Sequence, residues 1–468
     1  MKDRTGTLAT EGDDSLYEVR QKVYPRAVSG IYATARWALV WLTQIVFYGL
    51  CWVQWNGRQA FLLDLSERKF YVFGWVFWPQ DVFYLAVLLI ISAFALFLFT
   101  AVAGRLWCGY ACPQTVYTEI FLWIEERFEG NRARRMKLDA QGMSGEKLLR
   151  KGGKYLAWGV LSAWTGLTFV GYFTPIRELI PDLARFALSG WEWFWILFYG
   201  AFTYLMAGVM REQVCKYMCP YARFQAVMFD PDTLVITYDE ARGEPRGSRR
   251  RGSNARAQGL GDCVDCGICV QVCPTGIDIR QGLQYECIGC AACIDACDQV
   301  MDKVGSPRGL IRYSTENAVA RHWGRADILR HVLRPRILIY SAGLCALCIA
   351  FAWSLATRSP LRLDVIKDRS VITREVEGGL VENVYVLNLM NMSEGERAFR
   401  VGVTGLDGIR LDGADVVRIG PSQNKSVPVR VRVPVDDLAS GSHPILFSVQ
   451  AEDNAGLSTH EKAVFIAP

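Results

Sequence analysis

Two cysteine runs with identical spacing constrain this 468-residue chain more than any other feature. Each run has the form C-x-x-C-x-x-C-x-x-x-C. The first contains Cys263, Cys266, Cys269 and Cys273, and the second contains Cys287, Cys290, Cys293 and Cys297. Bacterial ferredoxins hold two [4Fe–4S] clusters with this spacing. We therefore predict a two-cluster, ferredoxin-like domain at about residues 255–305.

The ligands of the two clusters follow from the same arrangement, in which the fourth cysteine of each run serves the other cluster. The first cluster is expected on Cys263, Cys266, Cys269 and Cys297, and the second on Cys273, Cys287, Cys290 and Cys293. A zinc site needs four ligands and does not require a doubled run. Small residues inside the runs, Gly267 and Gly289, are expected to let backbone N–H groups approach the cluster sulphurs. Asp298 stands where a proline often follows the last cysteine.

The composition indicates a membrane protein, because 51% of the residues are apolar and 15 are tryptophans, which collect at bilayer interfaces. The polar residues 1–35 show no cleavable signal. Five stretches are long enough to span a bilayer at 1.5 Å per residue. They lie at about 36–55, 82–104, 154–175, 191–210 and 336–357. We predict a five-helix transmembrane bundle.

Lysine and arginine residues beside these stretches predict the orientation. They are dense in the N-terminal segment, in the connection after the second stretch and between 211 and 335, and sparse at 56–81 and 176–190. The expected protein is a multi-pass protein of the bacterial inner membrane. Its segments are a cytoplasmic 1–35, four helices in 36–210, a cytoplasmic cluster insert at 211–335, a fifth helix at 336–357 and a periplasmic 358–468.

Two segments outside the helices have distinct compositions. Residues 242–261 are rich in Gly, Arg and Ser, which predicts a flexible basic connector facing the lipid. After residue 357, short alternating runs predict an all-β, immunoglobulin-like sandwich without a disulfide. These runs are Val384–Leu389, Phe399–Val403, Val427–Val433, Ile445–Ala451 and Val464–Ile466.

A second cysteine motif, C-x-x-x-C-P, occurs once after each of two predicted spans. Its cysteines are Cys108, Cys112, Cys215 and Cys219. If the chain is helical there, each pair lies at i and i+4 on one face, and Pro113 and Pro220 end or kink the helix. Four converging thiolates suit copper(I) or another thiophilic metal. The alternative is that these cysteines are small buried apolar residues. For the C-x-x-C of Cys345 and Cys348, inside the last span, we favour that simpler interpretation.

The same inventory excludes two classes of function. All four histidines, His322, His331, His443 and His460, lie outside the apolar stretches, so no pair within a membrane helix can ligate a haem. The basic residues follow the topology, and nothing resembles a nucleic-acid reader.

Several longer segments resemble the cytochrome c oxidase accessory proteins of the CcoG/FixG/RdxA family, which are membrane polyferredoxins. The resemblance covers nearly the whole chain, including both ferredoxin runs and the β-rich tail. It is carried by VYPRAVSG, FWPQDVFYL, GRLWCGYACPQTVYTE, REQVCKYMCPYARFQAVMFDPDTLVITYD, RGEPRG and VGSPRGLIRYSTEN.

The resemblance implies a role in maturing a cbb-type cytochrome c oxidase by reducing copper(II) to copper(I) for the oxidase. Such a cupric reductase takes electrons from an unidentified donor and meets oxidase assembly factors, copper chaperones or copper transporters. Two alternatives stay open at this point. One is a quinol-oxidising polyferredoxin that passes electrons to a periplasmic reductase, and the other is a non-redox assembly scaffold.

Overall fold

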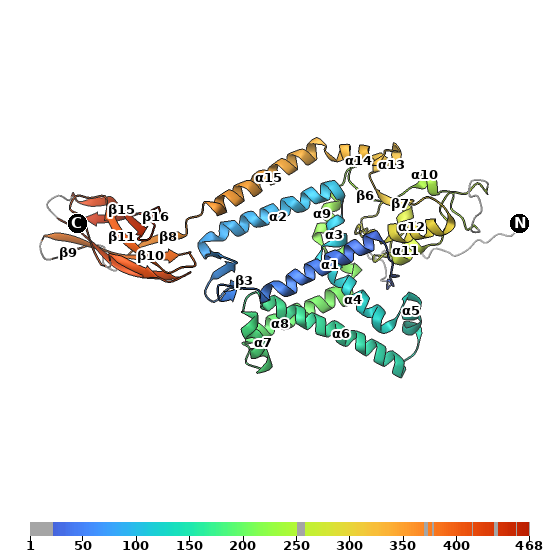
Figure 1. Ribbon diagram of the computed structural model, residues 1–468, viewed down its shortest axis with the longest axis horizontal. Helices are drawn as coiled ribbons and strands as arrows, with labels where there is room; N and C mark the ends of the chain where they lie inside the picture. Colours follow the sequence, from blue (N-terminus) through green and yellow to red (C-terminus); the bar gives the residue numbers. More distant parts are fainter. Residues whose placement is uncertain are drawn as a thin grey trace, which may run out of the picture. The chain divides into compact units, whose positions relative to one another are not determined.

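The computed structural model describes residues 22–249, 258–368, 373–376, 379–413, 415–434, 439–454 and 456–467. The chain divides into two compact units, which are described separately (Figure 1). The first unit comprises Met1–Leu39, Val102–Trp158 and Met206–Leu329, and contains all the cysteines predicted to bind metal. The second comprises Val40–Ala101, Gly159–Leu205 and Arg330–Pro468.

The first unit is built from short helices around one small antiparallel sheet, in which β6 (Val235–Tyr238) pairs with β7 (Ile311–Ser314). Two π-helical segments, Tyr204–Met210 and Val214–Met218, lie in the chain before α9. The helices that lie in this unit or enter it are α1 (Ile31–Gly49), α3 (Leu106–Tyr110), α4 (Pro113–Glu129), α5 (Arg132–Ala140), α6 (Gly145–Val170), α9 (Pro220–Met228), α10 (Glu240–Gly243), α11 (Ile268–Val272), α12 (Ala292–Val304), α13 (Glu316–Ala320) and α14 (Arg325–Val332).

The cluster domain packs α11 against α12 beneath the β6–β7 sheet, with Ile236, Ile279, Ile294 and Met301 among its buried residues. Pro274 follows Cys273, and α11 ends at Val272 because proline cannot continue the helix. Asp298 imposes no such stop, so Cys297 lies inside α12 and the helix runs on to Val304. The Asp298 carboxylate accepts a hydrogen bond from the Gly309 N–H at 2.9 Å.

The start of α1 is fastened to this domain. The carboxylate of Asp295 on α12 accepts hydrogen bonds from the backbone N–H groups of Ala33 at 2.7 Å and Tyr32 at 3.3 Å. A carboxylate is favourable there because the first N–H groups of a helix have no partner within it. The Arg36 guanidinium donates to the Cys290 carbonyl at 2.5 Å. The first helix is therefore anchored on the second cysteine run.

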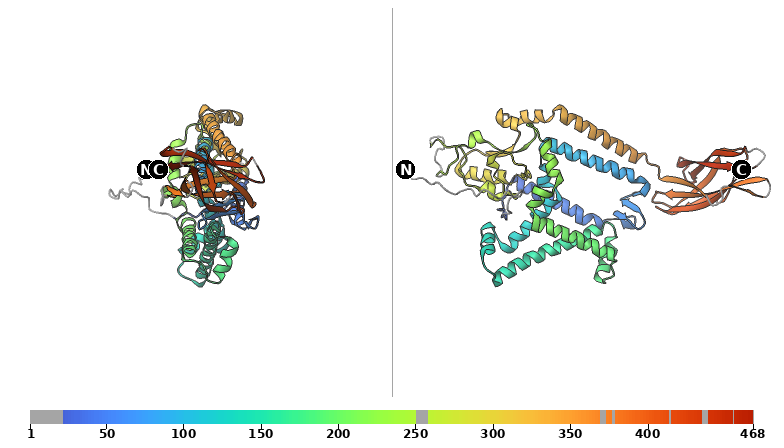
Figure 2. Two further views of the ribbon diagram at one scale, coloured as in Figure 1. Left: turned by 90° about the vertical axis from the view of Figure 1, so that its left-hand side faces the viewer. Right: turned by 180° about the vertical axis from the view of Figure 1, so that it is seen from behind.

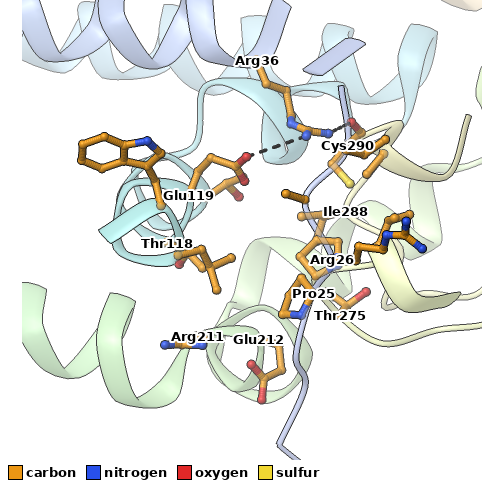
Figure 3. Close-up of a pocket in the computed structure, with 18 of the residues that line it drawn as sticks. Pro25, Arg26, Arg36, Thr118, Glu119, Arg211, Glu212, Thr275, Ile288 and Cys290 are labelled. Atoms are coloured by element: carbon orange, nitrogen blue, oxygen red, sulfur yellow. Dashed lines mark hydrogen bonds and ion pairs between the residues drawn. The ribbon is translucent and has the colours of Figure 1, made fainter. Parts of the chain in front are cut away.

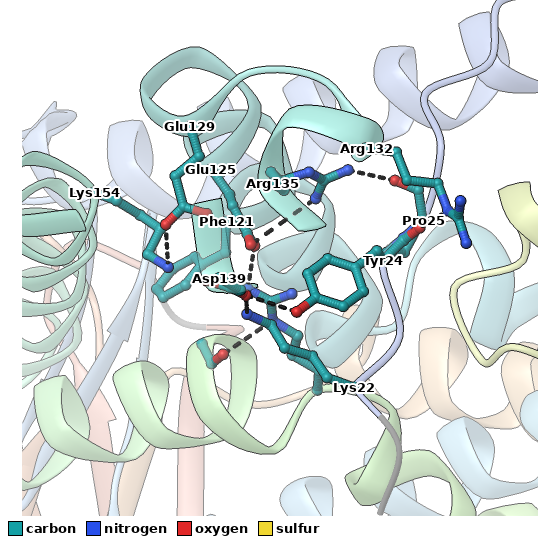
Figure 4. Close-up of polar contacts among 12 residues, drawn as sticks. Lys22, Tyr24, Pro25, Phe121, Glu125, Glu129, Arg132, Arg135, Asp139 and Lys154 are labelled. Atoms are coloured by element: carbon teal, nitrogen blue, oxygen red, sulfur yellow. Dashed lines mark hydrogen bonds and ion pairs between the residues drawn. The ribbon is translucent and has the colours of Figure 1, made fainter. Parts of the chain in front are cut away.

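The segment before α1 is held by a polar clamp on α5 and α6 (Figure 4). Asp139 accepts hydrogen bonds from Lys22 at 2.5 Å and from the Tyr24 hydroxyl at 2.7 Å, and it pairs with Lys151. Arg135 donates to the Pro25 carbonyl. Burial raises the pKa of the Asp139 carboxyl, but the hydrogen bonds from Lys151, Lys22 and Tyr24 outweigh it, so the pKa lies well below its usual value.

The predicted flexible connector at 242–261 is wrong for its described ends. Arg242 pairs with Asp262 at 2.5 Å, and Arg249 donates to the carbonyls of Gly261 and Asp262. The guanidinium groups expected to face lipid thus satisfy backbone carbonyls of the cluster domain, which are fixed acceptors at close range. Residues 250–257, which include the rest of the arginine run, lie outside the described residues.

The second unit contains the most apolar helices. Among the described residues, three helical segments are long and apolar enough to cross a membrane: Pro79–Ala103, Gly190–Met210 and Pro335–Ala356. They contain α2 (Val82–Ala103), α8 (Gly190–Thr203) and α15 (Pro335–Ala356). The other two expected spans are helical only in part. Helix α1 ends at Gly49, and α6 begins at Gly145 with polar turns and ends at Val170. The five-helix bundle remains a prediction.

Short hairpins precede α2 where no strands were predicted. Strands β1 (Gln54–Trp55) and β2 (Arg58–Gln59) pair, and β4 (Lys69–Val72) lies between β3 (Phe61–Asp64) and β5 (Trp75–Phe77). The turn at Asn56–Gly57 has positive φ at both residues, a conformation that Asn and Gly adopt most readily. Helix α7 (Ile176–Ala184) completes this part of the unit.

The C-terminal region is a two-sheet sandwich, coloured orange to red in Figures 1 and 2. One sheet has the order β12-β14-β10-β8, with β9 also paired to β10, and the other has the order β13-β11-β15-β16. The large residues Tyr385, Phe399, Phe447 and Phe465 are fully buried in its core. All five predicted runs lie within strands. The strands are β8 (Leu361–Lys367), β9 (Arg374–Val376), β10 (Leu380–Asn391), β11 (Arg397–Thr404), β12 (Arg410–Asp412), β13 (Val416–Ile419), β14 (Asn424–Pro434), β15 (Gly441–Ala451) and β16 (Ser458–Ala467).

The clamp on Asp139 predicts a local change in protease sensitivity. A carboxyl whose folded pKa is lowered stabilises the fold above its ordinary pKa of about 4, and this stabilisation is lost as the pH falls below that value. At pH 7 it is fully present, so Asp139→Asn is expected to speed tryptic cleavage after Lys22 and Arg26 several-fold. The control is Asp302→Asn, which breaks the exposed pair with Arg308 and should leave cleavage unchanged. Equal cleavage rates in wild type and Asp139→Asn would contradict the clamp.

Candidate metal-binding and electron-transfer site

The eight ferredoxin cysteines line two cavities in the first unit. A cavity of about 360 Å³ is lined by Cys263, Cys266, Cys269 and Cys297. A second cavity, of about 330 Å³, is lined by Cys273, Cys287, Cys290 and Cys293, with Cys269 also on its wall. Each cavity thus has three cysteines of one run and the fourth of the other. This donor set fits the expected exchange of the fourth ligand, and the individual assignments remain predictions.

The two runs share a backbone conformation around their second cysteine. In the first run Asp265 and Gly267, which flank Cys266, have φ of 50° and 63°. In the second run Gly289 and Ala291, which flank Cys290, have φ of 69° and 58°. Successive residues of alternating hand turn neighbouring N–H groups to one side and form an anion-binding hollow. The repeated feature is therefore the conformation, since Asp265 and Ala291 adopt it without being glycine.

The two C-x-x-x-C-P motifs do not lie on single helix faces, which corrects the expected geometry. Cys108 belongs to α3 and Cys215 to the π-helical segment Val214–Met218. Cys112 and Cys219 are the extended residues immediately before α4 and α9. The reason is the proline, which restricts the residue before it to extended conformations and favours the first position of the next helix. Pro113 and Pro220 therefore begin helices and do not end them.

The structure fastens the two motifs together. The Gln114 amide donates to the carbonyls of Met206 at 2.9 Å and Arg211 at 3.1 Å, which lie just before the second motif. The Arg105 guanidinium donates to the Ala222 carbonyl at 2.6 Å, just after it. These bonds cross more than ninety residues of sequence and bring both pairs of cysteines to one place.

The four thiols are close enough for their charges to interact. Burial raises the pKa of Cys108 to about 11, and the Cys112 and Cys219 thiolates would raise it further. Burial also raises the pKa of Cys215 to about 12, with additional repulsion from Cys112, Cys108 and Cys219. In the described part of the chain, no three His, Cys, Asp or Glu side chains are close enough to hold a single metal ion without movement. An ion bound by these cysteines would therefore need their side chains to rotate.

Sequence reasoning missed two polar residues beside these thiols. Gln225 on α9 is fully buried, with its Oε1 atom 3.5 Å from the Cys108 sulphur and its Nε2 atom without a partner among the described residues. Arg105 is 5% exposed, and its positive charge lowers the pKa of Cys108, Cys215 and Cys287. A buried donor and a buried cation both suit an anionic thiolate site. The GRLWC segment contained the arginine, but nothing in the sequence indicated its reach.

The first C-x-x-x-C-P motif lies directly against the second cluster loop. A Cβ atom added to Gly109 would come within 2.7 Å of the Gly289 carbonyl oxygen and 2.9 Å of the Cys290 Cα atom. The Tyr313 hydroxyl donates to the same Gly289 carbonyl at 2.7 Å. Cys108 and Cys215 pack against a buried group that includes Ile288 and Cys290. The four thiols and the second ferredoxin cavity are therefore neighbours in one unit.

Comparisons with known proteins agree with this architecture. A family model described as a 4Fe-4S dicluster domain matches residues 210–316, and one described as a 4Fe-4S binding domain matches residues 85–131. A third, an IG-like fold at the C-terminal of FixG, matches residues 351–468. The nitrogen fixation protein FixG of Rhizobium meliloti is 38% identical over 97% of this chain and 93% of its own length. The chain belongs to the FixG/RdxA family.

Two further relatives extend this result. Protein RdxA of Cereibacter sphaeroides is 37% identical over 89% of this chain and 90% of its own length. The methylamine utilization ferredoxin-type protein MauN of Methylobacillus flagellatus is 26% identical over 36% of this chain and 48% of its own length. This member of the FixG/RdxA family is thus an iron–sulphur electron-transfer protein with apolar helices that suit a membrane. Its immunoglobulin-like C-terminal domain is confirmed, whereas orientation and inner-membrane location remain predictions.

The contact at Gly109 predicts a selective loss of metal. Gly109→Ala places a methyl group against backbone atoms, which cannot move aside as a side chain can. We expect it to lower the iron retained by the purified protein, at the second cluster in particular, and to weaken the coupling between the two sites. The measurement is iron and sulphide content with electron paramagnetic resonance of the reduced protein. Gly152→Ala is the matched control, because a Cβ atom there meets nothing within 4 Å. Full iron content in Gly109→Ala would contradict the close approach.

Proposed function

We propose that this protein reduces copper(II) to copper(I) at Cys108, Cys112, Cys215 and Cys219, with electrons supplied by two [4Fe–4S] clusters. The observation that carries the proposal is the contact between the first C-x-x-x-C-P motif and the second cluster loop at Gly109. A site that exchanges electrons with a cluster must lie near it, and these four thiols do.

The chemistry of the four thiols supports copper as the substrate. Cysteine thiolates are soft ligands that select copper(I) over hard cations. The buried surroundings of Cys108 and Cys215 favour a site that excludes water, and Arg105 partly offsets the negative charge of bound thiolates. Copper enters here as the substrate, and it leaves reduced.

The electron step is simple to balance. Each cluster, when bound, supplies one electron to one copper(II) ion. The chain's own residues place the ion, because Cys112 and Cys219 begin helices whose N–H groups face them. The backbone N–H groups of Gln114 and Thr115 donate to the Cys112 sulphur and lower its pKa, although burial raises that pKa overall. A thiolate at a helix N-terminus is stabilised by these donors.

The biological role follows from the family resemblance. We propose that the reduced copper is delivered to the copper site of a cbb-type cytochrome c oxidase during its maturation. The immunoglobulin-like domain is the part of the chain proposed to meet assembly factors or copper carriers outside the membrane. The insert with the clusters is proposed to lie in the cytoplasm, where iron–sulphur assembly can supply it.

A second candidate is an additional iron–sulphur cluster on the same four cysteines. Two observations favour it. The family model at residues 85–131, which includes Cys108 and Cys112, is described as a 4Fe-4S binding domain. The four thiols are also too far apart for one ion without movement, as are the ferredoxin cysteines themselves. Iron counting separates the two candidates, because two clusters give about eight iron atoms per chain and three give about twelve.

The proposal predicts the behaviour of a fourfold variant. Replacing Cys108, Cys112, Cys215 and Cys219 together by serine should abolish tight copper binding and lower copper(II) reduction at least tenfold, because serine is a poor ligand for copper(I). The iron of the two ferredoxin clusters should stay. A suitable control is the double variant Cys345→Ser and Cys348→Ser, whose cysteines are exposed on α15. Unchanged copper binding and reduction in the fourfold variant would refute the copper site.

A further inference from the structure

A cavity beside both predicted redox groups has no assigned occupant. It has a volume of about 1010 Å³, including its open mouth, and lies entirely within the first unit. Figure 3 shows α1 with Arg36 on one side, α4 with Thr118 and Glu119 on another, and the N-terminal segment with Pro25 and Arg26 opposite. Arg211 and Glu212, just before the second C-x-x-x-C-P motif, close the remaining side.

The wall of this cavity reaches both metal-binding groups. Cys290, a predicted ligand of the second cluster, and Cys215, of the four-thiol site, both line it. The Arg36 guanidinium spans it, donating to the Cys290 carbonyl at 2.5 Å and lying 3.8 Å from the Glu119 carboxylate. A molecule bound here would stand within reach of an electron acceptor. The cavity is therefore placed for an electron donor.

The lining suits a neutral aromatic head group. Trp37, Trp123 and Leu122 contribute apolar surface, and Trp123 is half exposed at the mouth. Four arginines and three glutamates also line it, so their formal charges nearly cancel. Both Arg36 and Arg135 are more than nine-tenths buried, and each has an Nε–H without a partner among the described residues. Ligand sites combine apolar walls with a few such polar groups.

Helix α4 presents its carboxylates to the cavity in a regular way. Thr115, Glu119, Leu122 and Glu126 are spaced three or four residues apart, so they share one face of the helix. Glu119 lies deeper, beside Arg36, and Glu126 lies two turns further along. Two proton acceptors in a line match a donor that must lose two protons together with two electrons.

We infer that this cavity binds the head group of an isoprenoid quinol, which is the electron donor of the protein. This inference rests on the proposed electron-transfer function and names its donor. Both O–H bonds of the hydroquinone break. One proton passes to the Glu119 carboxylate and the other to Glu126, and both then leave to water. The two electrons pass singly to the two clusters, each of which accepts one, and the product is the quinone. One quinol thus supplies electrons for two copper(II) ions.

A quinol fits this cavity better than a phosphate-bearing donor such as a reduced flavin or nicotinamide nucleotide. Three carboxylates line the wall and would repel a phosphate, whereas the arginines there already face protein acceptors. Arg36 bonds the Cys290 carbonyl, Arg135 the Pro25 carbonyl, and Arg211 the Glu125 carboxylate. A quinol also carries a lipid-soluble tail, which suits a chain with apolar helices long enough to cross a membrane.

The test uses the full-length holoprotein in lipid nanodiscs and two separate readouts. The first is photolabelling by an azido derivative of ubiquinone with competition by decylubiquinone, mapped by mass spectrometry. We expect label in the peptides around Thr118 and Ile288. The second is the anaerobic rate of cluster bleaching by decylubiquinol, compared with the rate by dithionite. Thr118→Phe, which fills the cavity, should lower labelling at least tenfold.

Glu119→Gln tests the proton acceptor separately from binding. It should keep the labelling but lower quinol-driven cluster reduction at least tenfold, because a positioned base contributes about 10²–10⁴ in rate. Its dithionite-driven reduction should equal that of wild type, which shows that the clusters are intact. Glu146→Gln, in a pair exposed on α6, is the control and should change neither readout.

The outcomes separate this inference from the proposed function. Labelling elsewhere, labelling unaffected by Thr118→Phe, or faster cluster reduction by reduced flavin or nicotinamide than by quinol would overturn the quinol site. Copper(II) reduction after dithionite treatment would still stand in those cases. Conversely, quinol-driven cluster reduction without any copper(II) reduction would support the quinol site and refute the copper proposal.

Discussion

The close approach of Gly109 to the backbone of Gly289 and Cys290 is the contact on which the rest of the site depends. It brings a C-x-x-x-C-P motif, which follows a membrane-type helix, against the loop that carries a cluster ligand. No residue with a side chain fits there, because the facing atoms are backbone. The two cysteine systems of the chain thereby form one electron-transfer unit.

Several buried polar contacts maintain that approach. Asp295 holds the start of α1, Arg36 bonds the Cys290 carbonyl, and Arg105 bonds the Ala222 carbonyl. Removing one partner of such a contact leaves a buried charge or carbonyl unpaired, which costs more than the bond contributes. The polar network therefore specifies the geometry around the four thiols, and the same arginines and glutamates shape the cavity proposed for a quinol.

Much of this architecture could be predicted from the sequence. The spacing of the cysteines fixes ligand chemistry directly, and the alternating runs after residue 357 identify a sandwich because strand side chains alternate between faces. The hairpins at 54–77 escaped prediction since their strands are only two to four residues long. The extended conformations of Cys112 and Cys219 could have been found, because a proline follows each.

Other features depend on tertiary contacts that no local pattern reveals. Gln225 and Cys108 are 117 residues apart in sequence, as are Arg105 and Ala222. The cavity beside Cys215 and Cys290 is built by segments from four parts of the first unit, each unremarkable alone. The ends of the 242–261 segment looked like a linker by composition, but Arg242 and Arg249 find carbonyl and carboxylate partners on the cluster domain.

The central claim is that electrons reach the four thiols through the second cluster. The most direct test is a single-turnover measurement on Cys287→Ser, which removes a predicted ligand of that cluster and none of the four thiols. The protein is reduced anaerobically with dithionite, freed of excess reductant and mixed with copper(II). The account predicts that copper still binds but that its reduction slows at least tenfold relative to wild type. An unchanged rate, with the second cluster shown to be lost by electron paramagnetic resonance, would contradict it.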